Sequence, residues 1–282
     1  LVAAMGEMIL DAGDDEDKIL DIKKNQIYGI EYEETAFGLS TTNMLIHGDG
    51  NSNIRQGNCF DELDYISDKG INTVLMNPPY NAQRKHCNAE YVKTWEGKVK
   101  EDPSKGFHFV YEVAKKIKTG KLAVLLPMQC AIGASSAINY FKSKMLEEHT
   151  LDAVFSLPND IFHPGASAIA CCMIFNLGVR HDKSNINGTF FGYFKDDGFE
   201  KRKNIGRIEK DDGNWKSIKQ EWLNLYFGRK EKIGLSVIKN ITANDEWLAE
   251  AYMETDYSNL NSSDFQKILN GYIGYLMSNG RM

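Results

Sequence analysis

Apolar segments of two kinds alternate in the first half of the chain. Residues 1–10 and 33–48 carry apolar side chains at helical spacing, and Gly48 is placed to end the second of these helices. Residues 26–31 form a short apolar run that ends in an acid, as a strand does. The pattern therefore predicts strands and helices in turn.

The same alternation continues with stronger strands. Residues 71–76, 121–127 and 151–158 are almost continuously apolar, whereas residues 107–120 and 135–149 have the spacing of amphipathic helices. Continuously apolar strands between helices indicate a parallel sheet that is covered on both faces. We therefore expect an α/β fold with a doubly wound sheet.

The pattern changes after the last of these strands. Residues 168–177 and 189–194 are two apolar runs with no helical pattern between them, which predicts an antiparallel hairpin that closes the sheet. From residue 196 the sequence is polar, charged and spotted with aromatic residues, and it ends in a helical pattern over residues 262–277. The expected division is a core of residues 1–195 and a mixed or helical extension of residues 196–282.

Composition narrows the class of protein. The chain has 282 residues, 42% of them hydrophobic, and no run approaches the roughly 18 apolar residues that span a bilayer, so we expect a cytoplasmic protein. The five cysteines show no C-x-x-C spacing, and neither a disulfide framework nor a metal site is expected. A net charge of −6 argues against a surface that grips nucleic acid everywhere, although residues 84–121 hold ten basic and five acidic side chains.

Polar residues stand where three predicted strands end, the place at which doubly wound sheets bind ligands. Glu31 offers a carboxylate that could accept hydrogen bonds from ribose hydroxyls. Asn58 could pair with an adenine edge, with apolar contact from Cys59 and Phe60. Acids and amides also end many strands that bind nothing, so both readings stay open for these residues.

The stretch VLMNPPYN is more specific, because one chemistry explains Asn77, Pro78, Pro79 and Tyr80 together. The exocyclic amine of adenine is a poor nucleophile, since its lone pair is delocalised into the ring. Two rigid acceptors, the Asn77 side-chain oxygen and the Pro78 carbonyl, would draw that nitrogen toward tetrahedral geometry. Prolines add rigidity without adding donors. The alternative is a tight turn that the prolines merely stiffen.

Aromatic rings near this motif could stack on a base that is flipped out of the DNA duplex. Tyr80 offers a face for stacking, worth roughly 1–3 kcal/mol per base. Phe162 is either a second ring on the other side of the base or an ordinary core residue. The group transferred would be the methyl of S-adenosylmethionine, and a base in double-stranded DNA must be flipped out to receive it.

The order of IYGIE, QGNCF, VLMNPPY, KLAVLLP and LPNDIFHPGASAIACCMIF resembles the gamma-class N6-adenine DNA methyltransferases. TTNMLIHGDG and VLMNPPYN are similar in particular to the modification subunit of type I restriction-modification systems, and the resemblance covers residues 1–207. It implies a Rossmann-like fold that uses S-adenosylmethionine. It also implies two protein partners, a specificity subunit that reads the DNA sequence and a restriction subunit in the full complex.

The resemblance also assigns roles by position. Asn77, Pro78 and Tyr80 match the catalytic residues, and Phe162 matches the second stacking aromatic. Asn58 stands where the family commonly has Asp, so a weaker or differently oriented contact with the cofactor amine is expected. With the apolar contact of Cys59, the expected cofactor-binding residues are Glu31, Tyr32, Asn58, Cys59 and Pro79.

One departure concerns the cofactor. The family's Gly-rich turn after the first strand, which holds the methionine part of S-adenosylmethionine, is absent. The chain therefore looks like a fragment without its first, central strand and the helical domain upstream. On this reading it should bind cofactor poorly and should not methylate by itself.

Two other functions compete with DNA methylation. NPPY motifs also serve methyltransferases that act on a protein glutamine or on guanine in ribosomal RNA, although the flanking segments favour DNA. A non-catalytic alternative is an assembly module that binds a specificity subunit through C-terminal aromatic residues, which could equally pack against the core. These residues are Trp215, Trp222, Tyr226, Phe227, Trp247, Tyr252 and Tyr257.

Overall fold

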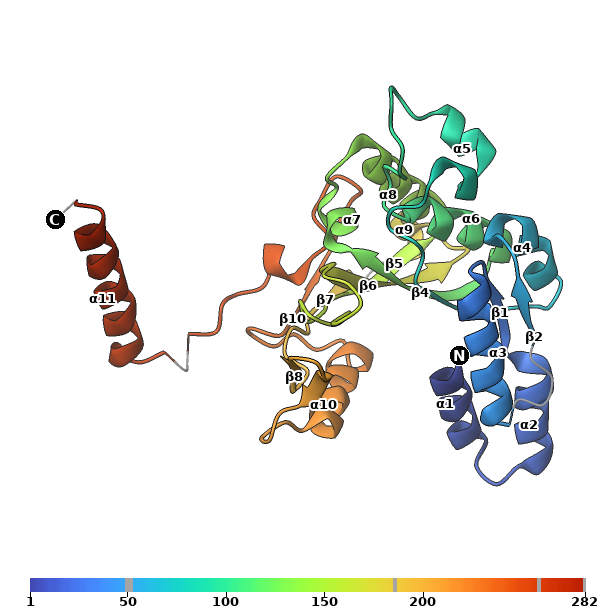
Figure 1. The fold of residues 1–282 in the computed structure, drawn as a ribbon, viewed down its shortest axis with the longest axis horizontal. Coiled ribbons are helices and arrows are strands. Elements are labelled where there is room, and N and C mark those ends of the chain that lie inside the picture. Colours follow the sequence, from blue (N-terminus) through green and yellow to red (C-terminus); the bar gives the residue numbers. More distant parts are fainter. Residues whose placement is uncertain (49–52, 185–186, 258–259, 281–282) are drawn as a thin grey trace.

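The structure is a computed structural model that describes residues 1–48, 53–184, 187–257 and 260–280 (Figure 1). Its strands are β1 (Tyr28–Glu31), β2 (Asn53–Gln56), β3 (Thr73–Met76), β4 (Gly120–Pro127), β5 (Thr150–Ser156), β6 (Ala170–Leu177), β7 (Thr189–Tyr193), β8 (Phe199–Arg202), β9 (Gly206–Glu209) and β10 (Ser236–Lys239). Its α-helices are α1 (Val2–Ala12), α2 (Glu16–Asp21), α3 (Glu34–Ile46), α4 (Cys59–Ser67), α5 (Ala89–Lys93), α6 (Phe107–Ile117), α7 (Met128–Ile132), α8 (Ser136–Glu148), α9 (His181–Ser184), α10 (Trp215–Phe227) and α11 (Ser262–Ser278). Short helical turns are η1 (Ile22–Gln26), η2 (Arg84–His86) and η3 (Ala249–Ala251).

A six-stranded mixed sheet forms the centre of the molecule, in the order β10-β7-β5-β6-β4-β3. β3 is parallel to β4 and β5 is parallel to β7, whereas β6 runs antiparallel to both β4 and β5. The predicted α/β class is confirmed. Because β3 lies at the edge of this sheet, the loop that follows Met76 leaves the sheet toward open surface.

The predicted hairpin of residues 168–177 and 189–194 is wrong. β6 and β7 are not neighbours, because β5 lies between them. β6 pairs with β4 over its whole length and with β5 on its other edge, so its uninterrupted apolar sequence reflects a central strand with both edges occupied. The antiparallel edge is instead made by β7 and β10, a strand from the C-terminal part of the chain.

Helices cover the faces of this sheet. α4, α6 and α8 pack side by side on one face (Figure 1), where Phe107, Met145 and Leu122 are fully buried. α8 begins where its sequence predicts, since the Ser135 hydroxyl accepts a hydrogen bond from the Ile138 N–H at 3.2 Å. α10 packs against β7.

The N-terminal segment forms a smaller unit. β1 and β2 make a parallel pair that shares no ladder with any other described strand. α1, η1 and α3 close a second apolar cluster with these strands, built on Met5, Ile22, Ile27, Met44 and Ile54. The unit contacts the rest of the molecule through α4, which follows β2 and touches β1, and through an ion pair of 3.1 Å between Glu7 and Lys219 of α10.

Several of the C-terminal aromatic residues pack against the core. Trp247 is completely buried in the main core, Tyr252 packs on Phe191, and Trp222 stacks on Phe194 with ring centroids 4.5 Å apart. Trp222, Trp247 and Tyr252 thus pack against the core, which was the alternative reading of these residues, and docking of a specificity subunit stays a prediction. Among the seven aromatic residues proposed for docking, those with mostly exposed side chains are Phe227 and Tyr257.

A buried lysine fastens this C-terminal segment to the core. The Lys142 ammonium donates to the carbonyl oxygens of Ala131 at 3.1 Å and Asp245 at 2.6 Å, and it lies 4.5 Å from the centre of the Trp247 ring. Burial lowers the pKa of Lys142 to about 8, against the opposing effect of Asp245 and Glu246. α11 lies apart from the body of the molecule (Figure 1), and no described helix is long and apolar enough to cross a membrane.

Candidate active site

One cavity of about 630 Å³ lies beyond the carboxyl ends of β1, β2 and β3. Its wall contains all the expected catalytic, base-stacking and cofactor-binding residues, although the three strands belong to two different sheets and Phe60 does not line the cavity. These residues are Glu31, Tyr32, Asn58, Cys59, Asn77, Pro78, Pro79, Tyr80 and Phe162. Parallel strand ends meet at one edge of a layer, which is why residues so far apart in the sequence converge here.

The segment after β3 presents its polar groups to this cavity. Pro78 is buried, whereas Asn77 and Pro79 are exposed. The Tyr80 hydroxyl donates a hydrogen bond to Asn77 Oδ1 at 3.3 Å. Pro78 and Pro79 have no N–H with which to donate to Asn77 Oδ1, and the Tyr80 hydroxyl is the donor that contacts it.

Two rings stand together at this end of the cavity. The centroids of Tyr80 and Phe162 are 6.4 Å apart and their planes are inclined by 66°, so the rings meet edge to face. The turn that carries Phe162 is held by two cations: Lys195 Nζ donates to Asn159 Oδ1 at 3.1 Å, and Arg207 Nε lies 3.1 Å from Asp160 Oδ1. A planar ligand between the rings would have to separate and rotate them.

The other end of the cavity carries the carboxylate of Glu31, the last residue of β1. Glu31 Oε1 accepts a hydrogen bond from the Glu33 N–H at 2.9 Å, which leaves the second oxygen for a ligand. Tyr32 is 55% exposed and its ring lies 4.7 Å from the ring of His86. Asn58 is turned toward the backbone: its Oδ1 accepts from the Phe60 N–H and caps α4, and its Nδ2 donates to the His86 carbonyl.

The sequence did not predict His86, which also lines the cavity. Its Nε2 is buried and has no hydrogen-bond partner among the described residues. A buried ring nitrogen without a partner is costly, so a polar ligand atom in the cavity would relieve that cost. The sequence carried no signal for this role, because it depends on how η2 folds back toward Tyr32.

Burial keeps the hydroxyl and thiol groups of the site protonated. The pKa of Tyr80 is raised to about 12, first by burial and then by neighbouring cysteines. Burial, with the charges of Asp61 and Glu112, also raises the pKa of Cys59 to about 12. Both groups are therefore protonated at neutral pH, where neither is a nucleophile. No three His, Cys, Asp or Glu side chains of the described residues are grouped as metal ligands.

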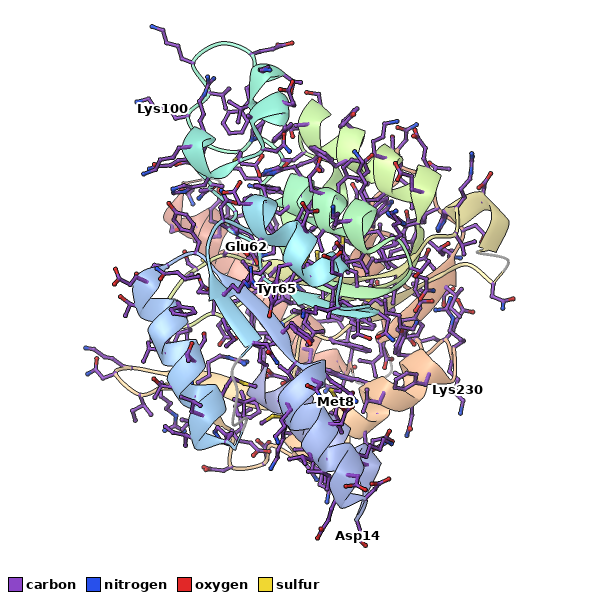
Figure 2. All side chains as sticks on the ribbon, turned by 90° about the vertical axis from the view of Figure 1, so that its right-hand side faces the viewer. Met8, Asp14, Glu62, Tyr65, Lys100 and Lys230 are labelled. Atoms are coloured by element: carbon purple, nitrogen blue, oxygen red, sulfur yellow. The ribbon has the colours of Figure 1, made fainter. Side chains whose placement is uncertain are left out.

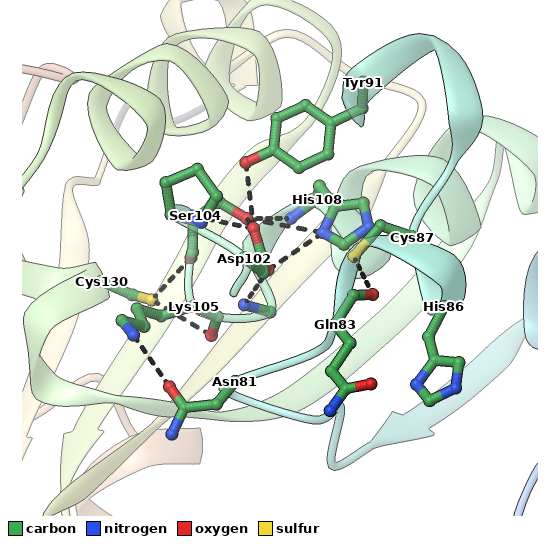
Figure 3. A network of polar contacts seen from close by, with 12 residues as sticks. Asn81, Gln83, His86, Cys87, Tyr91, Asp102, Ser104, Lys105, His108 and Cys130 are labelled. Atoms are coloured by element: carbon green, nitrogen blue, oxygen red, sulfur yellow. Dashed lines mark hydrogen bonds and ion pairs between the residues drawn. The ribbon is translucent and has the colours of Figure 1, made fainter. Parts of the chain in front are cut away.

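The fully buried carboxylate of Asp102 is the centre of a network of polar contacts (Figure 3). Asp102 Oδ1 accepts hydrogen bonds from the Ser104 N–H at 2.9 Å and from the Tyr91 hydroxyl at 3.0 Å. Its Oδ2 accepts from the Gly106 N–H at 2.7 Å and lies 3.1 Å from His108 Nδ1. Burial by itself raises the pKa of Asp102, but the hydrogen bond and charge of His108 and the two backbone N–H groups outweigh it, and the pKa is lowered.

The turn built around Asp102 touches the Asn77–Tyr80 segment directly. Gly106 has φ +93°, and a Cβ at this position would lie 3.2 Å from Pro78 Cγ and 3.3 Å from the Pro79 carbonyl oxygen. Only glycine combines this backbone conformation with so close an approach. Lys105 Nζ also donates to Asn81 Oδ1 at 2.8 Å (Figure 3). The two prolines are therefore supported from behind by a turn that the sequence pattern did not distinguish from a loop.

Comparisons with known proteins agree with this arrangement. Residues 3–258 match the family model described as N-6 DNA Methylase. The chain is 31% identical over 288 aligned residues to the type II restriction enzyme and methyltransferase RM.BcgI of Heyndrickxia coagulans, covering all of this chain and 42% of that protein. It is 28% identical over 142 residues to the type I restriction enzyme EcoEI methylase subunit of Escherichia coli, covering 50% of this chain and 28% of that one.

The fold has solved counterparts. A crystal structure of a modification subunit of a putative type I restriction enzyme from Vibrio vulnificus YJ016 superposes with a TM-score of 0.63 at 16% identity, over 85% of this chain and 48% of that one. The chain spans less than half the length of the two curated relatives. The family model matches nearly the whole chain and includes every residue of the cavity wall. The chain therefore belongs to the N-6 DNA methylase family.

Proposed function

We propose that the cavity is the site at which a methyl group passes from S-adenosylmethionine to N6 of an adenine in DNA. The observation that supports this most is the placement of Asn77 and the Tyr80–Phe162 ring pair at one end of a cavity whose other end holds the Glu31 carboxylate. One end suits a planar base with an amine, and the other suits a ribose.

Asn77 and Pro78 activate the amine. Its two N–H groups donate to Asn77 Oδ1 and to the Pro78 carbonyl, which turns the nitrogen lone pair out of conjugation and toward the methyl donor. The Pro78 carbonyl is fixed before the base arrives, because Pro78 is buried and Gly106 packs against it, and the Asn77 oxygen is held by the Tyr80 hydroxyl. When bound, S-adenosylmethionine supplies an electrophilic methyl group. Transfer would form the N–C bond as the S–C bond of the cofactor broke, and N6 would lose one proton to solvent.

The two rings receive the extruded base. Tyr80 and Phe162 separate from their edge-to-face contact and enclose the adenine, and this stacking offsets part of the cost of unstacking it from the duplex. The Tyr80 hydroxyl gives up its hydrogen bond to Asn77 Oδ1 when the amine takes that acceptor. The unliganded pair thus keeps the acceptor satisfied until substrate replaces the hydroxyl.

Residues for the nucleoside part of the cofactor are present. Glu31 has one carboxylate oxygen available for ribose, and the buried His86 Nε2 lacks a partner among the described residues. Tyr32, Cys59 and Pro79 add ring and apolar contact on the same wall. We assign no described residue to the methionine part.

The partners follow from the family. The curated relatives are named as restriction and methylase proteins, and we propose double-stranded DNA as the substrate, with a separate specificity subunit and a restriction subunit as partners of the whole protein. Such an enzyme works in the compartment that holds the DNA, which we take to be the cytoplasm.

Methyl transfer and base extrusion test this proposal together. Because residues of this chain line the cavity, we expect slow methyl transfer here, although the sequence alone predicted none. With the 282-residue chain in excess over DNA and S-adenosylmethionine at high concentration, N6-methyladenine should form, and Asn77→Ala should abolish it. We expect a low rate, since the sequence carries no Gly-rich turn for the methionine part. DNA with 2-aminopurine at the target position should brighten on binding in both proteins. Methylation on another base, or neither methylation nor brightening, would contradict the proposal.

A further inference from the structure

An arm, residues 81–105, projects from the catalytic segment. It begins directly after Tyr80, contains η2 and α5, and ends just before α6. Figure 1 labels α5 and α6. The arm stands above the helices that cover the sheet, and Lys100 lies at its outer end (Figure 2). Because it follows Tyr80 directly, its first residues lie next to the segment that would hold the adenine.

The two ends of the arm are fastened to each other. The Asp102 N–H donates to the Ala82 carbonyl at 2.9 Å, and Gln83 and Glu101 form an antiparallel bridge one step farther out. Asp102 is itself fully buried and ligated by Tyr91, from α5 within the arm. The base of the arm is thus a fixed support, so side chains along it keep their positions relative to the active site.

The arm encloses a basic hollow of about 640 Å³. The basic hollow is lined by four cationic side chains and one acidic side chain: Arg84, Lys85, Lys98, Lys100 and Glu101. Asn81 also lines it and directly follows Tyr80, which lines the active-site cavity, so consecutive residues contribute to the two cavities. The hollow therefore has three more positive than negative charges, whereas the whole chain has a net charge of −6.

The cations of the hollow lack acidic partners. The nearby carboxylates of Glu90 and Glu101 pair instead with Lys93 at 2.6 Å and Lys105 at 3.9 Å. No carboxylate of a described residue lies within ion-pair distance of Lys85, Lys98 or Lys100, and all three are exposed. A solvated structural surface would gain from interspersed acids, whereas a site for a polyanion excludes them.

Arg84 differs from the three lysines because it shapes the hollow. Its Nε donates to the Val99 carbonyl at 2.7 Å, and its guanidinium lies 5.4 Å from the centre of the buried Trp95 ring. These contacts hold the segment that contains Lys98 and Lys100 against the start of the arm. The lysines can therefore be changed without removing the arginine that orders the loop.

We propose that the basic hollow binds the phosphate backbone of the DNA strand beside the extruded adenine. This inference rests on the proposed function and adds the surface that holds the DNA in place. Backbone contacts carry no sequence information, so the arm positions the duplex while another surface selects the sequence. The three lysines point to about two or three phosphate contacts, each adding about 0.9 to the slope of log affinity against log salt concentration.

The test compares two triple variants of the whole chain. One is Lys85→Gln with Lys98→Gln and Lys100→Gln. The control, Lys216→Gln with Lys230→Gln and Lys239→Gln, makes the same charge change with exposed lysines that pair with no described acid. Figure 2 shows Lys100 and Lys230 toward opposite ends of the molecule. Fluorescence anisotropy with a duplex of about 20 base pairs, carrying a mismatched adenine, gives the affinity over a range of salt concentrations.

We expect the arm variant to weaken binding at least tenfold and to lower the salt slope by about two, with little change in the control. Equal losses in both variants, or salt-independent binding by the original chain, would overturn the inference. So would tighter binding of single-stranded RNA of the same length through the same lysines. The proposed function can fail separately. If DNA binding depends on the three lysines but no methyl group is transferred, the proposed chemistry is contradicted and the DNA-binding role of the hollow is not.

Discussion

The hydroxyl of Tyr80 donates to the side-chain oxygen of Asn77 at 3.3 Å, so the acceptor proposed for the adenine amine already has a donor. The same side chain offers a ring to stack on and a hydroxyl that competes for the acceptor. These two roles of Tyr80 can be separated by substitution.

Tyr80→Phe keeps the ring and removes the competing donor. We expect methyl transfer within about threefold of the original rate, whereas Tyr80→Ala should lose roughly 1–3 kcal/mol of stacking and bind extruded adenine about 5- to 150-fold more weakly. Single-turnover methylation and 2-aminopurine fluorescence measure the two effects. Tyr140→Ala, which removes an exposed ring from α8, is the control. A large loss in Tyr80→Phe would mean that the hydroxyl is needed.

Glu31→Gln should weaken cofactor binding. A hydrogen bond to a charged group contributes about 1.5–3 kcal/mol, so calorimetry with S-adenosylmethionine should show roughly 10- to 150-fold lower affinity. Glu34→Gln changes an exposed acid in the first turn of α3 that does not line the cavity, and it should bind like the original chain. Equal affinities of the Glu31 variant and the control would remove Glu31 from the cofactor site.

Asp102→Asn should destabilise the protein by about 2–4 kcal/mol at neutral pH, because the carboxylate accepts from several buried donors that an amide cannot all satisfy. The folded-state pKa of Asp102 is lowered, so this stabilisation is present above the ordinary pKa of about 3.9 and is lost as pH falls through the lower folded value.

Urea denaturation measures this effect. The gap in unfolding free energy between the original protein and Asp102→Asn should narrow below about pH 4. Glu101→Gln, the exposed neighbour, should cost less than about 0.5 kcal/mol at any pH. If the gap stays constant on acidification, Asp102 is not the ionised centre of the network.

Lys142→Met tests the buried lysine. The folded protein releases this proton near pH 8 and the unfolded chain near pH 10.5, so between these values the unfolded state binds more protons and stability rises with pH. Unfolding free energies should therefore increase by on the order of 1–3 kcal/mol across this range relative to Lys142→Met. Lys216→Met, an exposed control, should show no such divergence, and parallel curves for Lys142→Met would contradict the lowered pKa.

Sequence periodicity predicted the local elements well. The helix at 135–149 carries its own capping signal in Ser135, and the strand at 121–127 is continuously apolar, as a buried strand must be. Pairing was harder, because adjacency in the sequence does not determine adjacency in the sheet. β10 lies more than forty residues beyond β7, yet the two pair along their whole length.

The candidate site could also be predicted only in part from the sequence. Strand ends converge by geometry alone, so Glu31, Asn58 and Asn77 could be placed together from the sequence. Asp102 and His86 could not, because their importance lies in burial. Asp102 lies between Glu101 and Pro103 in a polar stretch with no periodic signal, and only the folded chain shows that it is completely enclosed.

The close approach of Gly106 to Pro78 has a practical meaning for protein engineering. The Asn-Pro-Pro-Tyr tetrapeptide is contiguous in the sequence, but its scaffold comes from residues more than twenty positions downstream. Transplanting the tetrapeptide alone into another sheet would transfer the acceptors without the backing that aims them. A functional graft has to include the Asp102–Gly106 turn, and any directed-evolution library that varies one of these segments should vary the other with it.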